Sequence, residues 1–570
     1  MKGTDKLNDL KRLGQRLLSG PLAGLFLAGF CLAIPGYGHS AEEAEKVVDA
    51  CADPEPAANS LGADYRQHTG KVIASIRYRT VDVFDTADPR EDNSLYRFLN
   101  WLHISTRPSV IGPQLLFEEG DTVKVDLLAE SERLLRTRPY LGDAVIQVDE
   151  VCGERVALLV TTRDIWTLEP QVSLSREGGE TGHGFGFSEE NLWGTGNALT
   201  LSYDKDQDRS HTALTFYTPH LLNTRVETRL GFAETSDGQQ SVLQVRRPFF
   251  SLDTVWAAGT TNWDITQDET IRYRDEEING YKLASEFHEV FAGWAFRRKE
   301  DFSKRLSLGV TQDRQQFRPN EDTQQPLPLD ENQVYVWLEY QYLEDAYEVY
   351  RNLHLLHRKE DVAMGMNLRV RFGHGGASLG NDNEFTVYQV DFTDVLGVGE
   401  HHLMQFAAWG KGVYYKDWFQ DERLWGGELG YHYLRGHKLR TYVQLGYSQG
   451  HQLAQHRELT LGGGEDLRGY PVDYQRGDRR YLLRVEQRYI SDVHLFNLVR
   501  LGGVVYLDAG RAWGAGYRDA THLSNVGVGL RFGSSKAKVG KVLHLDLAFP
   551  LADKQYVDKF QWVITASSRL

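Results

Sequence analysis

Two short motifs near the middle of the chain consist of residues that can do chemistry. Gly376–Gly380 reads Gly-Ala-Ser-Leu-Gly and fits the G-x-S-x-G pattern of serine hydrolases, whose nucleophile needs a strand, a sharp turn and a helix around it. Here the run lies between two alternating segments and is flanked by Gly, Asn and Asp, which predicts a simple turn. The adjacent His401 and His402 would point to opposite faces of a strand, so shared metal binding is disfavoured. We expect no enzyme activity, no metal and no cofactor.

The first residues of the chain read as a targeting signal. Basic residues within positions 1–16 precede a short apolar segment, Leu22–Ile34, and small residues stand at Gly38 and Ser40. This order of basic region, apolar region and small residues is typical of a secretory signal peptide. We expect residues 1–40 to be removed on export, and the alternative is an uncleaved membrane anchor.

Export would determine what the cysteines can do. Cleavage removes Cys31 and leaves Cys51 and Cys152 in an oxidising compartment. A disulfide between these two would staple the N-terminal segment to the first domain, and two unrelated free thiols are the alternative.

Composition narrows the class of protein. The chain has 570 residues, 64 of them basic and 79 acidic, and the net charge of −15 disfavours nucleic acid as a partner. No segment of the exported chain approaches the roughly 18–20 apolar residues that a membrane helix needs. Aromatic residues make up 11% and glycines number 55, and this content with short alternating segments is typical of a membrane β-barrel.

The region after the expected signal peptide divides into a linker, residues 41–70, and a small domain, residues 71–165. Hydrophobic periodicity predicts five elements in the domain: a strand from Lys71 to about Phe84, helices over Ser94–Leu102 and Val125–Arg136, and strands over Ala144–Val151 and Arg155–Thr162. The order β-α-α-β-β describes one complete α+β domain.

From residue 166 to residue 570 the helical period disappears. Segments of about ten residues alternate apolar and polar positions and break at Gly, Asn or Asp, which indicates one large closed antiparallel sheet. Soluble propellers or stacked sandwiches are the alternative, but no repeat motif supports them. The last segment places its apolar side chains on one face, as a lipid-facing final strand would: Phe560, Trp562, Ile564 and Leu570.

One loop motif resembles a known family. Gly462–Tyr470 contains Arg468-Gly469-Tyr470, followed by a strand with Glu486 and by a second with Asp508 in a D-x-G pattern. This arrangement resembles the BamA/TamA-type (bacterial surface antigen) superfamily of outer-membrane assembly and secretion proteins. The resemblance implies that the loop folds into the barrel lumen and that Arg468 pairs with Glu486 and Asp508, since a dehydrated guanidinium needs a bidentate carboxylate partner.

The resemblance also covers the region before the barrel. Leu115–Asp121, Leu127–Leu135 and Tyr140-Leu141 resemble a POTRA domain, the periplasmic module of this family, and Gly184–Gly196 resembles its passage between early barrel strands. Only one such domain fits in front of the barrel, fewer than the family usually has. The family implies sixteen barrel strands, whereas the alternating segments number nearer twenty.

These observations predict a membrane all-β protein: a C-terminal transmembrane barrel preceded by one POTRA-like domain. The resemblance implies a cell outer-membrane location in a Gram-negative-type bacterium, with the POTRA-like domain in the periplasm. The expected partners are outer-membrane lipid, unfolded protein cargo and, for its own insertion, the general barrel-assembly machinery. The expected function is protein translocation or insertion, and a surface antigen or passive channel without protein cargo is the alternative.

Overall fold

The structure is a computed structural model that describes residues 64–177, 180–299, 301–416, 421–464, 466–514, 516–537 and 542–567. The expected signal peptide, most of the expected linker, Cys51 and Leu570 lie outside the described residues. From Glu55 to Leu570 the chain forms one compact unit.

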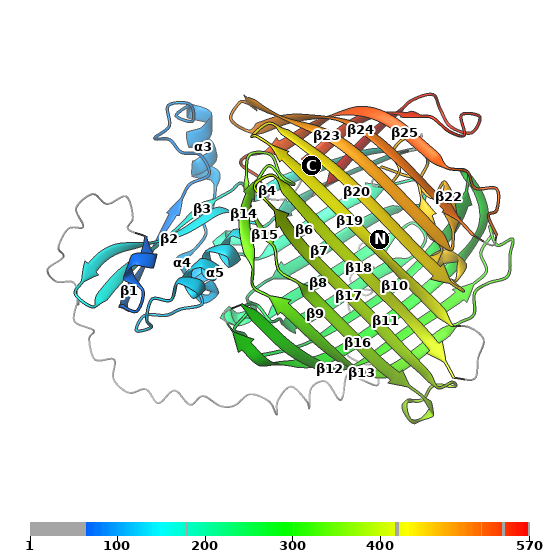
Figure 1. The fold of residues 1–570 in the computed structure, drawn as a ribbon, viewed down its shortest axis with the longest axis horizontal. Coiled ribbons are helices and arrows are strands. Elements are labelled where there is room, and N and C mark those ends of the chain that lie inside the picture. The colour runs from blue at the N-terminus through cyan, green and yellow to red at the C-terminus, as the bar shows by residue number, and fades with distance from the viewer. Residues whose placement is uncertain are drawn as a thin grey trace, which may run out of the picture. The chain divides into compact units, whose positions relative to one another are not determined.

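A small α+β domain precedes the barrel (Figure 1). Its elements, in chain order, are η1 (Tyr65–His68), β1 (Val72–Val81), α3 (Ser94–Leu102), α4 (Pro108–Ile111), η2 (Gly112–Gln114), α5 (Val125–Arg136), β2 (Leu141–Cys152) and β3 (Arg155–Asp164). The three strands form one sheet in the order β1-β3-β2, with β1 parallel and β2 antiparallel to β3. The helices α3 and α5 have the bounds that the periodicity predicts, whereas α4 was not predicted.

The core of the small domain lies between α5 and the sheet. Leu128 and Leu135 of α5 are fully buried in one cluster with Ile146 of β2 and Leu158 of β3. Helix α3 stands outside this core with most of its apolar side chains exposed, and Ile111 of the short helix α4 enters the core. The periodicity therefore predicts where α3 lies in the sequence, but it does not predict which surface its apolar face contacts.

The second part is a closed antiparallel barrel of twenty strands among the described residues. Ten of them precede the β14–β15 hairpin: β4 (Leu168–Glu177), β5 (Glu180–Glu189), β6 (Ala198–Lys205), β7 (Ser210–Thr218), β8 (Glu227–Thr235), β9 (Gln239–Arg247), β10 (Trp256–Tyr273), β11 (Glu276–Lys299), β12 (Phe302–Arg318) and β13 (Glu331–Glu344). Ten follow it: β16 (Asn367–Gly375), β17 (Phe385–Val398), β18 (His402–Tyr415), β19 (Glu422–Arg435), β20 (Leu439–His451), β23 (Arg479–Leu495), β24 (Val499–Trp513), β25 (Leu523–Ser534), β26 (Val542–Pro550) and β27 (Gln561–Ser567). Strand β27 pairs with β4 and closes the ring. The expected fold class is confirmed, and the strand number follows the segment count rather than the sixteen implied by the family.

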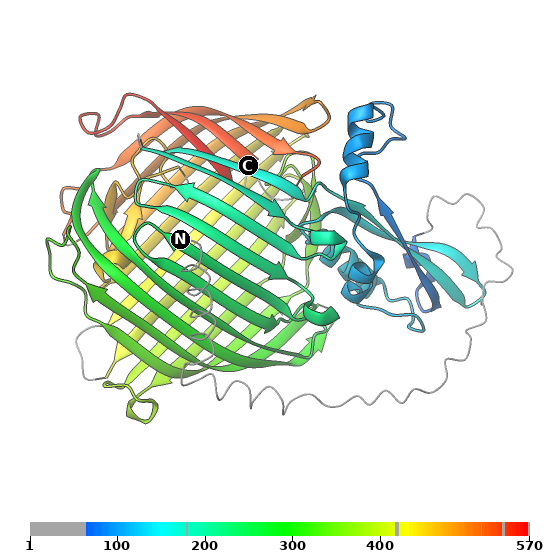
Figure 2. The same cartoon turned by 180° about the vertical axis from the view of Figure 1, so that it is seen from behind.

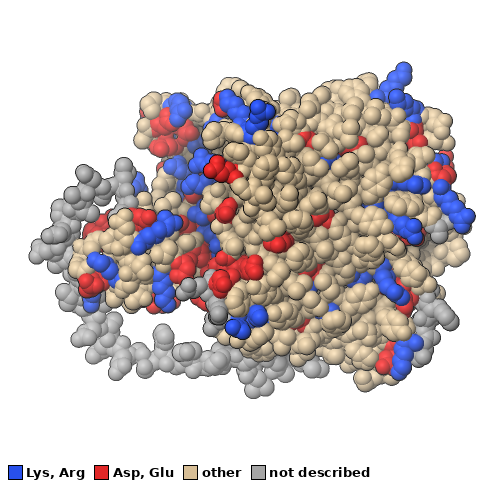
Figure 3. All heavy atoms as spheres, in the orientation of Figure 1, with Lys and Arg blue, Asp and Glu red and all other residues tan. Residues whose placement is uncertain are grey.

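The barrel wall alternates as a membrane-spanning sheet should. On β24, Tyr506 and Asp508 are buried toward the lumen, whereas Val505 and Leu507 between them are exposed on the outside. Figure 3 shows the same division over the visible face: charged side chains gather toward the two ends of the barrel, and the wall between them is mostly uncharged. Among the described residues no helix is long and apolar enough to cross a membrane.

Two segments extend from the wall at opposite ends of the barrel. We call the end next to the small domain the domain-side rim and the other end the far rim. At the far rim, residues 452–478 form the lumenal loop, which contains η6 (Gln455–Arg457), β21 (Leu459–Leu461) and β22 (Gln475–Gly477). At the domain-side rim, residues 345–366 form the mouth hairpin, with strands β14 (Tyr347–Arg351) and β15 (Lys359–Ala363) and a tip between them (Figure 1).

The remaining short helices lie in turns of the barrel: η3 (Leu192–Gly194), η4 (Leu221–Asn223) and η5 (Ala377–Leu379). The G-x-S-x-G run forms η5, a single 3-10 turn between β16 and β17 that ends on Gly380 in the left-handed region. It is not followed by the helix that a hydrolase nucleophile requires.

Candidate functional site: the lumenal loop and the mouth hairpin

The arginine of the lumenal loop, Arg468, lies among three carboxylates of the barrel wall and is only 3% exposed. Its Nε and Nη2 donate to the two oxygens of Asp508 at 2.7 and 2.8 Å, and Nη2 lies 2.8 Å from Oε1 of Glu486. Its Nη1 lies 3.3 Å from Oδ2 of Asp546, and its guanidinium carbon lies 3.4 Å from the ring centre of Tyr506. Removing this guanidinium would break several buried charge-assisted contacts at once, so these contacts hold the loop strongly.

The strand register explains why these groups meet. Residues two apart on a strand share a face, so Tyr506 and Asp508 of β24 both face the lumen. Glu486 of β23 stands opposite Tyr506, and Asp546 of β26 stands opposite Gly529 of β25. The lumenal loop connects β20 directly to β23, so its motif lies beside the strands that carry its partners.

The other two residues of the motif fix the position of the loop backbone. Gly469 has φ +83°, and a Cβ added there would lie 2.9 Å from the Cβ of Ala548. Tyr470 is fully buried, and its hydroxyl lies 2.8 Å from the carbonyl oxygen of Ser524. On the same strand, the side chain of Asn525 donates a hydrogen bond of 2.7 Å to the carbonyl oxygen of Arg468. The motif is thus held by its side chains and by its main chain.

The motif alone did not reveal Asp546 as a partner of the arginine. Asp546 also pairs with the buried Arg531, so it joins two guanidinium groups. Two glycines on the lumenal face of β25 make the room for this cluster. A Cβ at Gly529 would lie 1.7 Å from Oδ1 of Asp546, and one at Gly527 would lie 2.3 Å from the hydroxyl of Tyr506. A single acid in the middle of a mostly apolar last-but-one strand was the available sequence signal.

The mouth hairpin crosses the domain-side mouth of the barrel. It leaves the wall between β13 and β16, yet its tip contacts β20, β23 and β26. Arg440 of β20 donates from Nε to the carbonyl oxygen of Asn352 at 3.2 Å, and Nε2 of His357 lies 2.8 Å from the carbonyl oxygen of Ser491. Leu356 is buried between the tip and the walls of β23 and β26. The hairpin therefore obstructs the path from the small domain into the lumen.

An internal carboxylate shapes the tip of the hairpin. Glu360 of β15 accepts hydrogen bonds from the backbone N–H groups of Leu353, His354 and Leu355, at 2.9, 2.9 and 3.2 Å. Burial raises the pKa of Glu360, and the three N–H donors oppose that shift. The tip thus has a defined conformation of its own.

Helix α5 of the small domain holds the base of the mouth hairpin. Arg136 donates from Nε and Nη2 to the two oxygens of Asp361 at 2.9 and 2.8 Å. Arg133 lies 3.2 Å from Asp345 and stacks 3.7 Å from the ring centre of Tyr347. The four charged side chains are 17–20% exposed, so water reaches these pairs and weakens them relative to the buried Arg468 cluster.

The same helix covers the outer edge of strand β2. The N–H of Ile146 donates to Oε1 of Glu132 at 2.6 Å, and Nη1 of Arg136 donates to the carbonyl oxygen of Ala144 at 3.2 Å. Burial raises the pKa of Glu132 because water is excluded around its carboxylate. The opposite edge, strand β1, bonds to residues 119–123. Both edges of the sheet are therefore partly occupied by the domain's own groups.

A continuous set of contacts joins the mouth hairpin to the lumenal loop. Arg488 of β23 donates from Nη1 to the carbonyl oxygen of Leu353 in the hairpin tip at 3.4 Å. Its Nε donates to Oε2 of Glu486 at 2.8 Å, and the other oxygen of Glu486 contacts Arg468. The two segments thus share one carboxylate.

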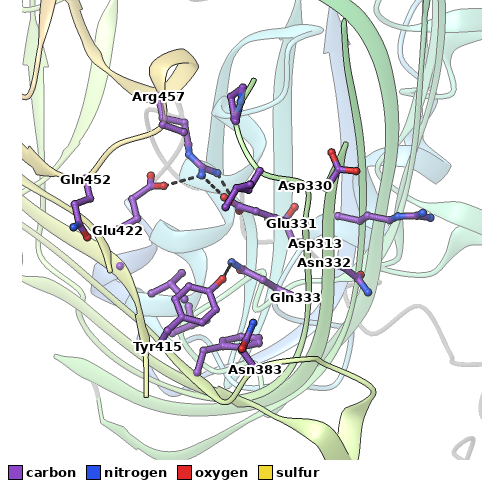
Figure 4. A pocket seen from close by; sticks show the side chains of 18 of the residues that line it. Asp313, Asp330, Glu331, Asn332, Gln333, Asn383, Tyr415, Glu422, Gln452 and Arg457 are labelled. Atoms are coloured by element: carbon purple, nitrogen blue, oxygen red, sulfur yellow. Dashed lines mark hydrogen bonds and ion pairs between the residues drawn. The ribbon is translucent and has the colours of Figure 1, made fainter. Parts of the chain in front are cut away.

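A neighbouring part of the lumen is open and polar. A cavity of about 1030 Å³ lies between the lumenal loop and the wall formed by β12, β13 and β17–β19. Figure 4 shows Arg457 of the loop reaching into it, 2.7 Å from Glu331 and 2.7 Å from Glu422, while Gln333 donates to the hydroxyl of Tyr415 at 2.8 Å. This side of the loop is held by polar contacts around an open volume, not by close packing.

The last strand presents apolar side chains to the outside. Phe560 and Trp562 are 52% and 46% exposed, whereas Val563 is buried on the lumenal side and Ile564 is half-buried. This is the alternation expected of a lipid-facing strand.

Cys152, the last residue of β2, forms a disulfide bond. Cys51 is outside the described residues, so its pairing with Cys152 stays a prediction.

These features define a class: a closed outer-membrane-type β-barrel whose lumenal loop is held by an arginine among wall carboxylates. The family comparison agrees, because the profile of the Omp85 superfamily domain matches residues 191–567. The chain belongs to the Omp85 superfamily, which confirms the resemblance inferred from the Arg468 motif. Membership places it in the outer membrane, among proteins of membrane-protein insertion or secretion.

Three solved structures are similar to this one. BamA from Haemophilus ducreyi lacking POTRA domains 1–3 has 13% identity and a TM-score of 0.38, with 87% of this chain and 84% of that chain covered. CdiB from Acinetobacter baumannii has 12% identity and a TM-score of 0.41, with 88% and 74% covered. CdiB from Escherichia coli has 12% identity and a TM-score of 0.41, with 88% and 76% covered. No curated protein sequence matches the chain.

Proposed function

We propose that this protein moves unfolded polypeptide through or into the outer membrane and that its mouth hairpin is the gate. In this proposal the small domain is a POTRA-like domain in the periplasm, and it receives the cargo before the barrel does. Superfamily membership supports protein transport in general, and the specific role of the gate rests on the contacts of helix α5. The chain acts as a conduit without a nucleotide motif, so cargo folding supplies the free energy.

The cargo would add as a strand to the outer edge of β2. At this edge, the carbonyl oxygen of Ala144 accepts a hydrogen bond from Arg136, and the N–H of Ile146 donates to Glu132. An incoming strand must displace both α5 side chains. Arg136 also holds Asp361 of the mouth hairpin, so displacing α5 side chains from the edge loosens the hairpin. This shared arginine is the single observation that carries the proposal.

The exit would be either the lumen or the seam between the first and last strands. Among the described residues, β27 and β4 register at one residue pair, Ile564 with Arg176, whereas β26 and β27 register at seven. Opening this short seam breaks few backbone hydrogen bonds, which favours sideways release of the cargo into the bilayer. We expect the general barrel-assembly machinery to insert the chain itself.

The first test compares the outer-membrane and surface proteomes of cells in which this protein is depleted and then restored. We expect a defined set of proteins to disappear and return. A photo-crosslinking residue at Gln147, on the half-buried outer face of β2, should capture members of that set, while the same residue at Arg79 on β1 serves as the matched control. An unchanged proteome together with pore formation by purified protein would establish the passive channel instead.

The second test locks the gate. A Cβ built at Gly533 lies 3.1 Å from the Cβ of Leu356, close to the 3.5–4.5 Å of disulfide-bonded cysteines, so Leu356→Cys with Gly533→Cys should cross-link tip to wall. We expect transport to stop under oxidising conditions and to return with reductant. The wild-type chain with the same reductant is the control, because Cys152 is itself disulfide-bonded. Normal transport by the cross-linked protein would exclude the hairpin as the gate.

A further inference from the structure

Helix α3 has its apolar face on the surface of the molecule. Leu95, Phe98, Trp101 and Leu102 are 58%, 53%, 77% and 50% exposed, and the rings of Phe98 and Trp101 stack at 5.8 Å. A surface helix of a soluble domain normally turns such a stripe toward the core. A contiguous apolar patch that stays exposed marks a contact with a protein or a membrane.

The opposite face of α3 is the one that packs. Tyr96 is buried and stacks on Phe84 with ring centres 4.3 Å apart, and Leu99 packs against the same cluster. The N-cap Asn93 accepts a hydrogen bond of 2.9 Å from the N–H of Tyr96, which fixes where the helix begins. The outward direction of the apolar stripe is therefore set by packing on the other side.

The packed face also ties α3 to the domain-side rim of the barrel. The hydroxyl of Tyr96 donates to the carbonyl oxygen of Phe496, in the turn between β23 and β24. The preceding loop joins the same rim, because Asn497 donates to the carbonyl oxygen of Arg90 at 3.2 Å and Lys536 lies 2.7 Å from Glu91. Figures 1 and 2 both show α3 beside the rim next to the last barrel strands.

The apolar outside of the barrel reaches this turn. Val493 and Leu495 at the end of β23 are exposed, and Phe496 in the turn is 83% exposed. These residues continue the exposed apolar side chains of the wall, such as Val505 and Val528, which face lipid in a membrane barrel. The lipid-facing surface thus extends to the residue that α3 contacts.

We propose that α3 is an interfacial helix whose apolar face inserts into the bilayer leaflet at the domain-side rim, so that it anchors the small domain to the membrane. Amphipathic helices with Trp, Phe and Leu on one face bind in this way. Arg97 pairs with Asp92 at 3.2 Å and Arg90 with Asp88 at 2.7 Å, so the nearby charges largely compensate one another. Insertion should then depend on apolar burial and not on anionic lipid. The inference is independent of any protein cargo.

The test uses the full-length protein in nanodiscs of phosphatidylcholine, with a nitroxide attached at Phe98→Cys. Power saturation by oxygen reports lipid exposure, and saturation by a water-soluble nickel complex reports water exposure. Labels at Val505→Cys on the lipid face and Asp322→Cys in a far-rim loop give the two reference ratios. Arg97→Cys, exposed on a different side of α3, is the matched control.

We expect the oxygen-to-nickel ratio at Phe98 to equal that at Val505, and the ratio at Arg97 to fall toward that at Asp322. A water-like ratio at Phe98 would overturn the proposal. Low accessibility to both reagents would overturn it as well, because the face would then be covered by protein. A second measurement does not require labelling. Brominated phosphatidylcholine quenches the fluorescence of tryptophans that contact lipid. The share of the total tryptophan emission that is quenched should therefore be smaller in Trp101→Phe than in the wild-type protein. An equal quenched share in the two proteins would contradict insertion of α3 into the bilayer.

Discussion

The lumenal loop and the mouth hairpin are both held inside the barrel by arginine–carboxylate pairs, but in opposite ways. Arg468 is almost completely buried and meets three carboxylates, and the backbone around it is fixed by Asn525 and Tyr470. The hairpin's base is held by Arg133 and Arg136, which water reaches and which belong to a different domain.

This difference indicates which of the two segments can move. Breaking a buried pair by removing one partner costs about 3–5 kcal/mol, whereas an exposed pair contributes about 1 kcal/mol or less. The lumenal loop is therefore a fixed element of the fold, and the base of the mouth hairpin is the more easily released of the two attachments. Substitutions at four places in the structure test that distinction.

The largest effect is expected at the loop arginine. Arg468→Ala should destabilise the folded barrel by about 3–5 kcal/mol because it removes the buried hydrogen bonds to Asp508 and the ion pairs with Glu486 and Asp546. Arg468→Glu should go further, with loss of the folded barrel or of transport. The free energy of unfolding in lipid measures this change. The folded and unfolded barrels can be told apart by their different migration on gels before and after heating. Arg435→Ala, at an exposed arginine, should stay within about 0.5 kcal/mol. Normal cargo handling by Arg468→Glu would refute the assignment.

The next effect is expected at the neighbouring glycine. Gly469→Ala combines a positive φ with a Cβ placed 2.9 Å from Ala548, and we expect a loss of about 1–3 kcal/mol. Gly380→Ala is the matched control, because it has φ +82° with nothing within 4 Å of the new Cβ. It should show the backbone cost alone. Equal losses at the two positions would mean that the loop has room to shift.

A smaller stability effect but a larger functional one is expected at the hairpin base. Arg133→Ala with Arg136→Ala should cost about 1 kcal/mol or less per ion pair, yet raise the conductance of the purified protein in planar bilayers. Arg66→Ala, which removes an exposed pair with Asp64 in the same domain, is the control. Unchanged conductance would show that the hairpin stays in place without α5.

The smallest effect is expected at the edge of β2. The pKa of Glu132 is raised above its ordinary 4.5, so its contribution to stability is fully present below about pH 4.5 and is lost as the pH rises through the higher folded-state pKa. Glu132→Gln keeps an oxygen for the N–H of Ile146 and removes the titration. Stability at pH 7 should change by no more than about 0.5 kcal/mol. The part of the pH dependence that begins near pH 4.5 should disappear, and an identical pH profile would contradict this assignment.

The sequence predicted the elements well where a single period governs them. Helices Ser94–Leu102 and Val125–Arg136 carry clear apolar stripes, and the alternation of the barrel segments indicated nearer twenty strands than sixteen. Periodicity reports that one face of α3 is apolar, but it cannot say whether protein or lipid covers that face. It also cannot predict the mouth hairpin, because β14 and β15 are short and, in the part of the chain that the structure describes, pair only with each other.

The candidate site was predictable to the extent that it follows a loop motif. Arg468, Glu486 and Asp508 could be grouped by resemblance, and in the structure Arg468 lies 2.8 Å from Glu486 and 2.7 Å from Asp508. Asp546 could not, because its place depends on the register between β25 and β26 and on the space left by Gly529. The contacts of the hairpin with α5 join segments more than two hundred residues apart, which no local pattern encodes.

The number of strands has a consequence for the size of the opening. Barrel diameter grows roughly in proportion to strand number, so twenty strands enclose a cross-section roughly one and a half times that of sixteen. The lumenal loop spans part of such a cross-section, from Arg468 at β23–β26 to Arg457 at β13 and β19, and the polar cavity beside Arg457 is open volume. A wide opening in the outer membrane would let solutes leak across it, so a second obstruction at the other end becomes necessary for a resting barrel to be tight.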